Sequence, residues 1–397
     1  MEKKEEFIRV GTTLYKIVDQ PRIDGGYVRK RIAWNSETLR QDYGKDYMAS
    51  VPKYDGFCTV PEHIGYRSVV GKFLNLYEPI SHVSRQGDFL CIRSLVGHIF
   101  GEQYELGMDY LQLLYLCPVQ KLPILLLVSE ERNTGKSTFL NFLKAVFQNN
   151  VTFNTNEDFR SQFNSDWAGK LLIMVDEVLL NRREDSERLK NLSTTLSYKV
   201  EAKGKDRDEI GFFAKFVLCS NNEHLPVIID AGETRYWVRK IVPLRSDDTD
   251  FLQKLKAEIP AFLHFLCNRT LSTEKESRMW FNPKLLETDA LRKIIRSNRN
   301  RLEIEMAELL LDIMASVDIC SVSFCLNDII PLLVCSQVKV EKSQVRKVVQ
   351  ECWKLTPASN SLSYTTYQYD YNRECRYSPV RRIGRYYTVS KEQLVTL

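Results

Sequence analysis

The sequence lacks long hydrophobic runs, paired cysteines and a strong excess of one charge. Its longest apolar run, Leu122–Val128, is far shorter than the roughly 20 residues that a membrane-spanning helix needs, and its charged start does not resemble a signal peptide. We therefore expect a cytoplasmic protein without a membrane partner. None of the ten cysteines has the C-x-x-C spacing of a zinc site, so reduced thiols are expected. A net charge of +5 over 397 residues is too small for a basic coat, so any nucleic-acid contact must come from local clusters.

A chain of 397 residues exceeds the size of a typical domain, so two or three cores are expected, and patterning along the chain divides it into five parts. Helical apolar spacing with a break near Gly101 indicates a collar of two helices, and a polar stretch with interspersed Lys and Arg indicates a linker. We predict an N-terminal region of unknown function at 1–86, the helical collar at 87–118, an α/β domain at 119–270, the linker at 271–300 and a small domain at 301–397.

The segment between about 122 and 244 has the pattern of a sheet covered by helices. Short apolar runs alternate there with helical or polar stretches, which favours the α/β class. We predict strands at Pro123–Val128, Val151–Asn154, Leu171–Val175, Lys215–Cys219 and Tyr236–Val242, followed by a helix at Asp250–Cys267.

The segment Ser129–Thr138, SEERNTGKST, stands between a predicted buried strand and an amphipathic helix. This is the context in which a phosphate-binding P-loop occurs. Backbone N–H groups of the loop and of the helix start would point at one spot and bind the phosphates of ATP. Lys136 would reach the β- and γ-phosphates, and Ser137 would place its hydroxyl on Mg²⁺. The candidate ATP-binding residues are Arg132, Asn133, Thr134, Gly135, Lys136, Ser137 and Thr138.

One residue departs from the P-loop pattern G-x-x-x-x-G-K-[ST]. Glu130 stands where the pattern has its first glycine. Glycine at that point relieves backbone strain, whereas the N–H donors, the lysine and the hydroxyl are present without it. Taken alone, the motif could also be a chance G-K-S-T in front of an ordinary amphipathic helix.

Two other strands end in polar residues that suit ATP hydrolysis. The strand Leu171–Val175 leads into Asp176, which would hold Mg²⁺ through water, and Glu177, which would orient and deprotonate the attacking water. A later strand leads into Asn221, a candidate sensor of the γ-phosphate. The alternatives are a strand that merely stops at a charged turn and an ordinary Ser-Asn-Asn turn.

Two arginines, Arg235 and Arg239, lie beside the last predicted strand of this segment. A guanidinium supplied by a neighbouring subunit would stabilise the charge of the transition state, as arginine fingers do. From the residues alone, a surface or interface arginine is an equally good interpretation.

The order of these features resembles that of the superfamily 3 helicases, and most closely the primase-helicases of phages, mobile elements and poxviruses. The P-loop, the Asp176-Glu177 pair, a basic stretch at 199–207, Ser220-Asn221 and Trp237–Arg239 follow one another as in those proteins. The resemblance implies an AAA+ ATPase that forms a hexamer and moves 3′ to 5′ on DNA. It assigns the finger to Arg239. Val238 departs from the family, because a second arginine often stands at that position, and Arg235 is therefore kept as the alternative.

The same resemblance implies a DNA-contacting hairpin that faces a central channel. Its matched basic positions are Lys203 and Lys205, which flank a glycine and suit contact with backbone phosphates rather than bases. Without the resemblance, a solvated loop of mixed charge is the simpler interpretation.

The last hundred residues predict a winged-helix-like module. Helical spacing at 302–317, 328–334 and 343–354 is followed by alternating aromatic and polar residues up to Val389, which are typical of strands. Ser343 is the expected N-cap of the third helix, which would bring Arg346 and Lys347 to DNA. A generic α+β oligomerisation or docking domain is the alternative.

These predictions together describe an α/β protein with an AAA+-type P-loop sheet and flanking helices, preceded by a helical collar and followed by a small α+β winged-helix-like domain. The expected function is ATP- and Mg²⁺-dependent unwinding of single-stranded or forked DNA by a homohexamer. A primase or polymerase would be a separate partner, and a phage or mobile element would place the protein in the cytoplasm of a bacterial host. The alternatives are another P-loop motor, such as a helicase loader or packaging ATPase, and a non-hydrolysing DNA-binding initiator or scaffold.

Overall fold

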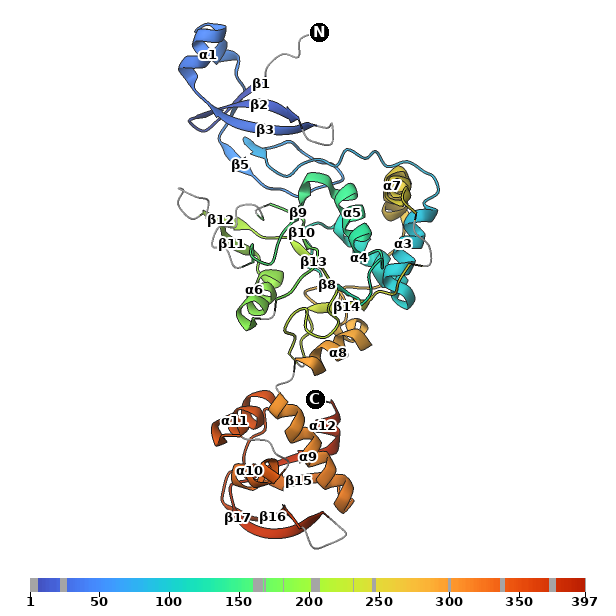
Figure 1. The fold of residues 1–397 in the computed structure, drawn as a ribbon. Coiled ribbons are helices and arrows are strands. Elements are labelled where there is room, and N and C mark those ends of the chain that lie inside the picture. The colour runs from blue at the N-terminus through green and yellow to red at the C-terminus, as the bar shows by residue number, and fades with distance from the viewer. Residues whose placement is uncertain are drawn as a thin grey trace. The chain divides into compact units, whose positions relative to one another are not determined.

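The protein is described here by a computed structural model, shown in Figure 1. The described residues are 6–21, 27–159, 167, 169–180, 182–200, 208–230, 232–244, 248–298, 301–335, 340–370 and 376–396. They form two compact units, which are treated separately. Unit 1 comprises residues 1–228 and 233–291, and unit 2 comprises residues 229–232 and 292–397. No helix among the described residues is long and apolar enough to cross a membrane, and the nine described cysteines are free thiols.

Unit 1 is built on a five-stranded sheet with the order β14-β8-β13-β10-β9. All neighbouring strands run parallel. The middle strands are buried along their whole length, which explains why their sequences are continuous apolar runs rather than alternating ones. The five strands confirm those predicted from the sequence and are β8 (Ile124–Val128), β9 (Val151–Phe153), β10 (Leu172–Val175), β13 (Lys215–Ser220) and β14 (Tyr236–Lys240).

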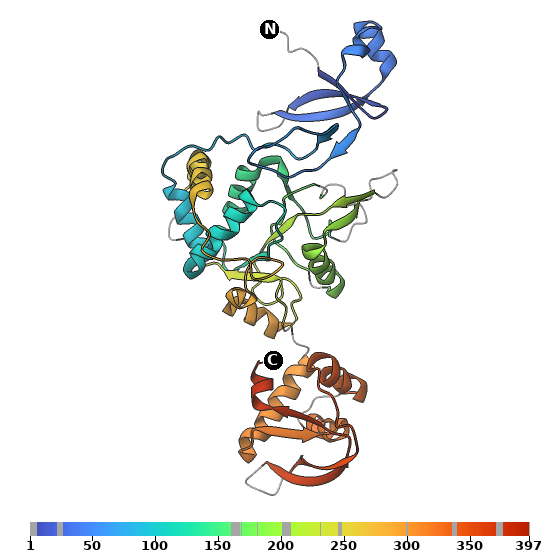
Figure 2. The same ribbon diagram turned by 180° about the vertical axis from the view of Figure 1, so that it is seen from behind.

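Helices cover both faces of this sheet, as Figures 1 and 2 show. On one side lie the two collar helices, α3 (Leu90–Phe100) and α4 (Tyr104–Leu116), together with α5 (Lys136–Phe147) and α7 (Phe251–Asn268). The opposite side carries α6 (Arg183–Thr194). The predicted break of the collar is confirmed, because Gly101 has a φ of 49° at the start of a short 3-10 turn, η1 (Gly101–Gln103).

The stretch 271–291, predicted as part of a linker, packs on the core of unit 1. Phe281 and Leu286 are buried in the same cluster as the sheet. Leu286 ends a 3-10 turn, η4 (Pro283–Leu286), which precedes α8 (Asp289–Ser297). The boundary between the units lies inside α8. The linker prediction is therefore wrong for these residues, because a few large apolar side chains anchor a stretch that is polar on average.

Residues 6–75 form two small sheets. The first has the order β3-β2-β1-β4, and its residues Phe7 and Leu14 form a small apolar core with Leu39 of the adjoining helix. The second has the order β5-β7-β6. Their strands are β1 (Glu6–Val10), β2 (Thr13–Pro21), β3 (Tyr27–Trp34), β4 (Lys53–Tyr54), β5 (Gly56–Cys58), β6 (Val69–Val70) and β7 (Phe73–Asn75), and their helices are α1 (Ser36–Tyr43) and α2 (Tyr47–Ser50).

Unit 2 consists of helices and two antiparallel strand pairs around one apolar core. The helix α11 (Lys342–Lys347) is N-capped by Glu341, which forms a capping box with Gln344, so the predicted N-cap Ser343 is wrong by two residues. The other elements are α9 (Arg301–Val317), β15 (Ser321–Phe324), α10 (Leu326–Cys335), a π-helical turn (Val348–Cys352), the hairpin of β16 (Leu362–Tyr369) and β17 (Tyr377–Gly384), β18 (Tyr387–Ser390), which pairs with β15, and α12 (Lys391–Thr396).

Candidate nucleotide site

The carboxyl ends of β8, β13 and β10 meet at one edge of the parallel sheet. Their registers bring Ser129, Asn221 and Asp176 to this edge, each directly after a buried strand. The 129–135 loop then leads from β8 into α5. Ligands of open α/β sheets bind at the carboxyl ends of the strands, so this edge is the candidate site.

Lys136 is the centre of the site. Its ammonium donates hydrogen bonds to the hydroxyl of Ser129, to Oγ1 of Thr134 at 3.0 Å and to Oδ1 of Asn221 at 3.0 Å. The residue is only 6% exposed, and burial lowers the pKa of its ammonium. Within the described part of the chain these partners are all neutral, so the positive charge has no directly bonded carboxylate. Such a charge suits an anionic ligand at this edge.

Ser137 and Asp176 form the second half of the site. The hydroxyl of Ser137 donates to Oδ2 of Asp176 at 2.7 Å, and both residues are exposed. One hydroxyl and one carboxylate next to a phosphate position are the protein ligands that Mg²⁺ uses, because the ion keeps most of its waters. The described residues contain no group of three or more His, Cys, Asp or Glu that could hold a metal ion. A magnesium ion here would therefore need the oxygens of a bound phosphate and water.

The backbone of the 129–135 loop tolerates Glu130. The loop residues with positive φ are Asn133 at 53° and Gly135 at 81°, and Glu130 is not among them. Glycine's freedom is thus needed at Gly135, where Leu244 and His98 also lie within 4 Å of the position that a Cβ would take. The departure from the glycine pattern at Glu130 costs no backbone strain in this loop.

Glu177 follows Asp176 in the left-handed region, with a φ of 62°. A non-glycine residue in this region is uncommon and concentrates at functional sites. The carbonyl of Glu177 accepts a hydrogen bond from Nδ2 of Asn156 at 3.2 Å, and Oδ1 of the same Asn156 accepts from the amide of Leu179 at 2.9 Å. Asn156 therefore holds the turn that presents the exposed Glu177 carboxylate.

Glu223 is a residue of the site that the sequence did not indicate. It is 2% exposed, and its carboxylate accepts from the amide of Glu130 at 3.2 Å and from Nζ of Lys240 at 3.0 Å. It thereby ties the start of the 129–135 loop to the end of β14. Its position two residues after Asn221 was the available signal, but only the fold brings it to the loop.

His98 is a second residue that the sequence did not indicate. Its Nε2 lies 3.0 Å from the carbonyl oxygen of Thr134, so α3 of the collar supports the 129–135 loop directly. The amide of Leu244 donates to the carbonyl of Asn133 at 3.0 Å on the same loop.

Arg239 does not have the geometry of an arginine finger. Its side chain is 8% exposed, and its guanidinium donates to Oε1 of Glu102 at 2.6 Å and to Oε1 of Gln103 at 2.8 Å. Both partners belong to the turn between the collar helices, so Arg239 fastens β14 to the collar. Arg235 lies just before β14, is partly exposed and contacts Glu233 at 3.5 Å.

The remaining predicted residues lie at different places. Arg132 is exposed and Thr138 is half-buried, both next to Lys136 in sequence. Lys203 and Lys205 lie outside the described residues, between the strands β11 (Ser197–Val200) and β12 (Asp208–Gly211), which pair as an antiparallel hairpin. Arg346 and Lys347 are exposed at the end of α11 in unit 2.

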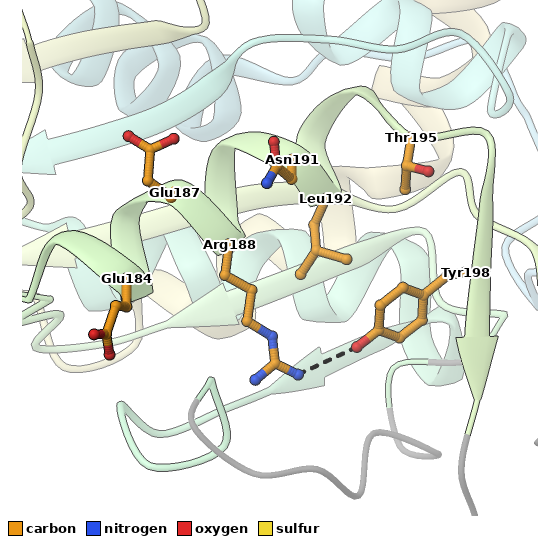
Figure 3. A pocket seen from close by; sticks show the side chains of 7 residues that line it. All are labelled: Glu184, Glu187, Arg188, Asn191, Leu192, Thr195 and Tyr198. Atoms are coloured by element: carbon orange, nitrogen blue, oxygen red, sulfur yellow. Dashed lines mark hydrogen bonds between the residues drawn. The ribbon is translucent and has the colours of Figure 1, made fainter.

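A shallow pocket lies between α6 and β11, at the base of this hairpin (Figure 3). The guanidinium of Arg188 donates to the hydroxyl of Tyr198 at 3.2 Å across it. The other lining residues are Glu184, Glu187, Asn191, Leu192 and Thr195. Two carboxylates in the lining repel phosphate, so this pocket is a poor site for a nucleotide.

The chain is a mixed α/β protein with a parallel sheet, and residues 127–237 match a family of unknown function, DUF5906. The apo structure of the NrS-1 C terminal region is similar over 96% of this chain and 95% of that one, with a TM-score of 0.60 and 17% identity. Its A form is similar over 89% and 84%, with a TM-score of 0.57 and 17% identity. This chain therefore shares the fold of that region.

Two other comparisons carry no argument about function. A JCV helicase with a bound small molecule matches 58% of this chain and 66% of that one, at 14% identity and a TM-score of 0.32, which is too low to support a shared fold. No curated protein matches the chain in sequence.

Proposed function

We propose that this chain is an ATP-driven DNA motor, the helicase part of a replication protein of the superfamily 3 AAA+ type. The observation that carries the proposal is the meeting of Lys136, Ser137, Asp176 and Asn221 at one edge of the sheet. Three separate segments supply these side chains, namely the start of α5 and the ends of β10 and β13, so a chance G-K-S-T sequence does not account for them. The unstrained Glu130 removes the main objection to a working P-loop.

Each side chain then has a role in phosphoryl transfer to water. Lys136 binds the β- and γ-phosphates as its partners Ser129 and Thr134 give way to ligand oxygens. Ser137 and Asp176 would hold Mg²⁺, which would offset the negative charge of the phosphates. Glu177 orients the attacking water and accepts its proton.

Asn221 completes this set as the sensor. Its Oδ1 accepts from Lys136 at 3.0 Å, which leaves its amide N–H₂ as the donor that faces the γ-phosphate or the water. The finger from a neighbouring subunit is Arg235 in this proposal, because Arg239 is committed to Glu102 and Gln103 within its own chain.

DNA contacts come from two places. The β11–β12 hairpin would carry Lys203 and Lys205 into the channel of a homohexameric ring, and unit 2 would act as a winged-helix module with Arg346 and Lys347 on DNA. Three helices, a hairpin and a second strand pair in unit 2 support this assignment. Single-stranded or forked DNA is the substrate, and a primase or polymerase is a separate partner.

The test is ATP turnover with Mg²⁺, with and without single-stranded DNA, in the wild type and in Glu177→Gln. We expect DNA-stimulated turnover in the wild type and a loss of about 100-fold or more in the variant, in the range by which general-base catalysis contributes. ATP binding should survive in Glu177→Gln and be lost in Lys136→Ala. A wild type that binds ATP and DNA but never hydrolyses would favour a scaffold and overturn the motor.

A further inference from the structure

The positive charge of this chain is concentrated in its C-terminal part. Residues 292–397 contain 16 lysines and arginines and 11 aspartates and glutamates, so this part accounts for the whole net charge of +5. A net positive charge attracts the phosphate backbone of nucleic acids.

One face of the β16–β17 hairpin combines this charge with an apolar side chain. The cross-strand pairs Ser363–Ile383 and Thr365–Arg381 lie side by side on the same face, and all four residues are exposed. Ile383 is 80% exposed, because the short hydroxyl side chain opposite cannot cover it. A branched apolar residue in this position has no packing role within the described part of unit 2.

The hairpin that presents this face is anchored. The buried carboxylate of Asp328, at the start of α10, accepts from Nη1 of Arg382 at 2.6 Å, from the hydroxyl of Tyr364 at 2.7 Å and from the amide of Cys325 at 2.7 Å. On the other side of Ile383, the guanidinium of Arg385 donates to the carbonyl of Ser359 at 2.8 Å. These bonds fix β17 on both sides of Ile383.

Arg381 differs from these two arginines. Arg382 and Arg385 are held by bonds inside unit 2, whereas Arg381 makes no hydrogen bond or ion pair among the residues that the structure describes. Its guanidinium is therefore available to a ligand. It stands two residues before Ile383 on the same face of β17, about 7 Å along the strand.

We propose that this face of the hairpin is a wedge for the end of a DNA duplex. Ile383 packs against the terminal base pair at a fork, and Arg381 binds a phosphate of the same end. Apolar side chains beside arginines are used in this way to unstack base steps, and the anchored hairpin supplies the rigidity that insertion requires. The inference rests on the proposed function only in taking DNA as the ligand, and it makes the double-stranded side of the fork the target of unit 2.

The experiment uses the full chain without nucleotide and a fork that carries 2-aminopurine at its first base pair. The variants are Ile383→Ser, Arg381→Gln and, as a matched control, Val334→Ser, which removes another exposed apolar side chain of unit 2 (56% exposed). The wild type should raise 2-aminopurine fluorescence on binding. Ile383→Ser should abolish this rise and weaken fork binding about tenfold, the size expected for one apolar side chain, with affinity for single strands unchanged.

Arg381→Gln should weaken fork binding and reduce its dependence on salt, and Val334→Ser should match the wild type. Equal fluorescence in Ile383→Ser and wild type would overturn the wedge, as would an equal loss on forks and single strands. Normal fork binding in Ile383→Ser would also overturn the wedge, and it would favour protein docking as the role of this face. ATP turnover is measured separately, so failure of the motor proposal and failure of the wedge are distinguishable.

Discussion

Glu223 shows how a single buried carboxylate can support a loop that departs from the P-loop pattern. It accepts from the amide of Glu130 and from Lys240, and so links the first turn of the 129–135 loop to β14. A backbone amide bound to a carboxylate is a charge-assisted hydrogen bond, stronger than a neutral one. Removing the carboxylate should therefore loosen the loop without touching Lys136.

We expect Glu223→Ala to raise the KM for ATP about tenfold, the value of one charge-assisted bond, and to change kcat much less. Glu223→Gln keeps an acceptor for the Glu130 amide, so its KM for ATP should lie between the values of Glu223→Ala and the wild type. Steady-state kinetics measure both parameters, with Glu308→Gln in unit 2 as the control. A drop in kcat at constant KM would instead place Glu223 in the chemical step.

Mutation of the two arginines near β14 should affect different properties of the protein, stability in one case and ATP turnover in the other. Arg239→Ala should lower the melting temperature, because a mostly buried guanidinium and its bonds to Glu102 and Gln103 are lost. Arg235→Ala should leave the melting temperature unchanged and abolish turnover. Calorimetry and ATPase assays distinguish the two effects. An Arg235→Ala protein with full activity would show that the finger lies elsewhere.

The chemistry of the site was predictable from sequence where a motif carries its own local geometry. Lys136 and Ser137 follow a strand within one loop, and Asp176 and Asn221 directly follow buried strands, so parallel pairing alone brings them together. Glu223 and His98 could not be predicted, because their roles depend on amides and carbonyls of distant segments. The contacts of Arg239 with Glu102 and Gln103 could not be predicted either, because these partners lie more than 130 positions away.

At the scale of elements, His63 ties the segment after β5 to the collar. Its Nδ1 lies 2.7 Å from the carbonyl oxygen of Tyr115 at the end of α4, and its Nε2 lies 2.6 Å from the hydroxyl of Tyr77. The ring stacks on Tyr115 with 5.4 Å between centroids. Burial lowers the pKa of His63 from 6.5 to about 4.

This shift predicts that unit 1 loses stability in mild acid. Below pH 6.5 the unfolded chain binds a proton at His63 that the folded chain does not bind until about pH 4, so stability falls through this window. We expect a loss of about 1 kcal/mol between pH 7.5 and 5.5 from this group. Urea unfolding at the two pH values measures it. His63→Gln should remove this part of the pH dependence, His264→Gln should not, and an unchanged dependence in His63→Gln would contradict the assignment.

The β11–β12 hairpin is the element expected to couple DNA to ATP. Changing Lys203 and Lys205 to Glu should abolish the stimulation of ATP turnover by DNA, because the phosphate contacts become repulsive. The same change at Lys45 and Lys72, which are exposed in turns of the N-terminal region, is the control. If stimulation and unwinding persist after the change at Lys203 and Lys205, the hairpin does not contact DNA.

The boundaries of helices and strands were predictable where apolar residues recur with a clear period. They were not predictable where only a few buried side chains hold a segment to the core. The strands of the sheet and the broken collar follow from runs such as Leu171–Val175 and from the break at Gly101. The stretch 271–291 was mistaken for a linker, because a few side chains such as Phe281 and Leu286 bind it to the core and leave no period. The sheets of residues 6–75 likewise rest on short strands with mixed burial.

The molecule consists of two compact units. Residues 1–291 contain the candidate nucleotide site of a single chain and are neutral overall, whereas residues 292–397 carry the excess positive charge. This separation of the nucleotide site from the positive charge fits the proposed motor, in which one unit would hydrolyse ATP and the other would bind DNA. The chain shares its fold with the NrS-1 C terminal region over nearly the whole length of both chains.

The most direct test of the motor is the unwinding of a forked duplex by the wild type and by Glu177→Gln, with ATP and Mg²⁺ present. We expect strand separation by the wild type that depends on ATP hydrolysis, and a Glu177→Gln protein that binds ATP and the fork but releases no strand. Strand release by Glu177→Gln at the rate of the wild type, or none by a wild type that hydrolyses ATP on the fork, would contradict it.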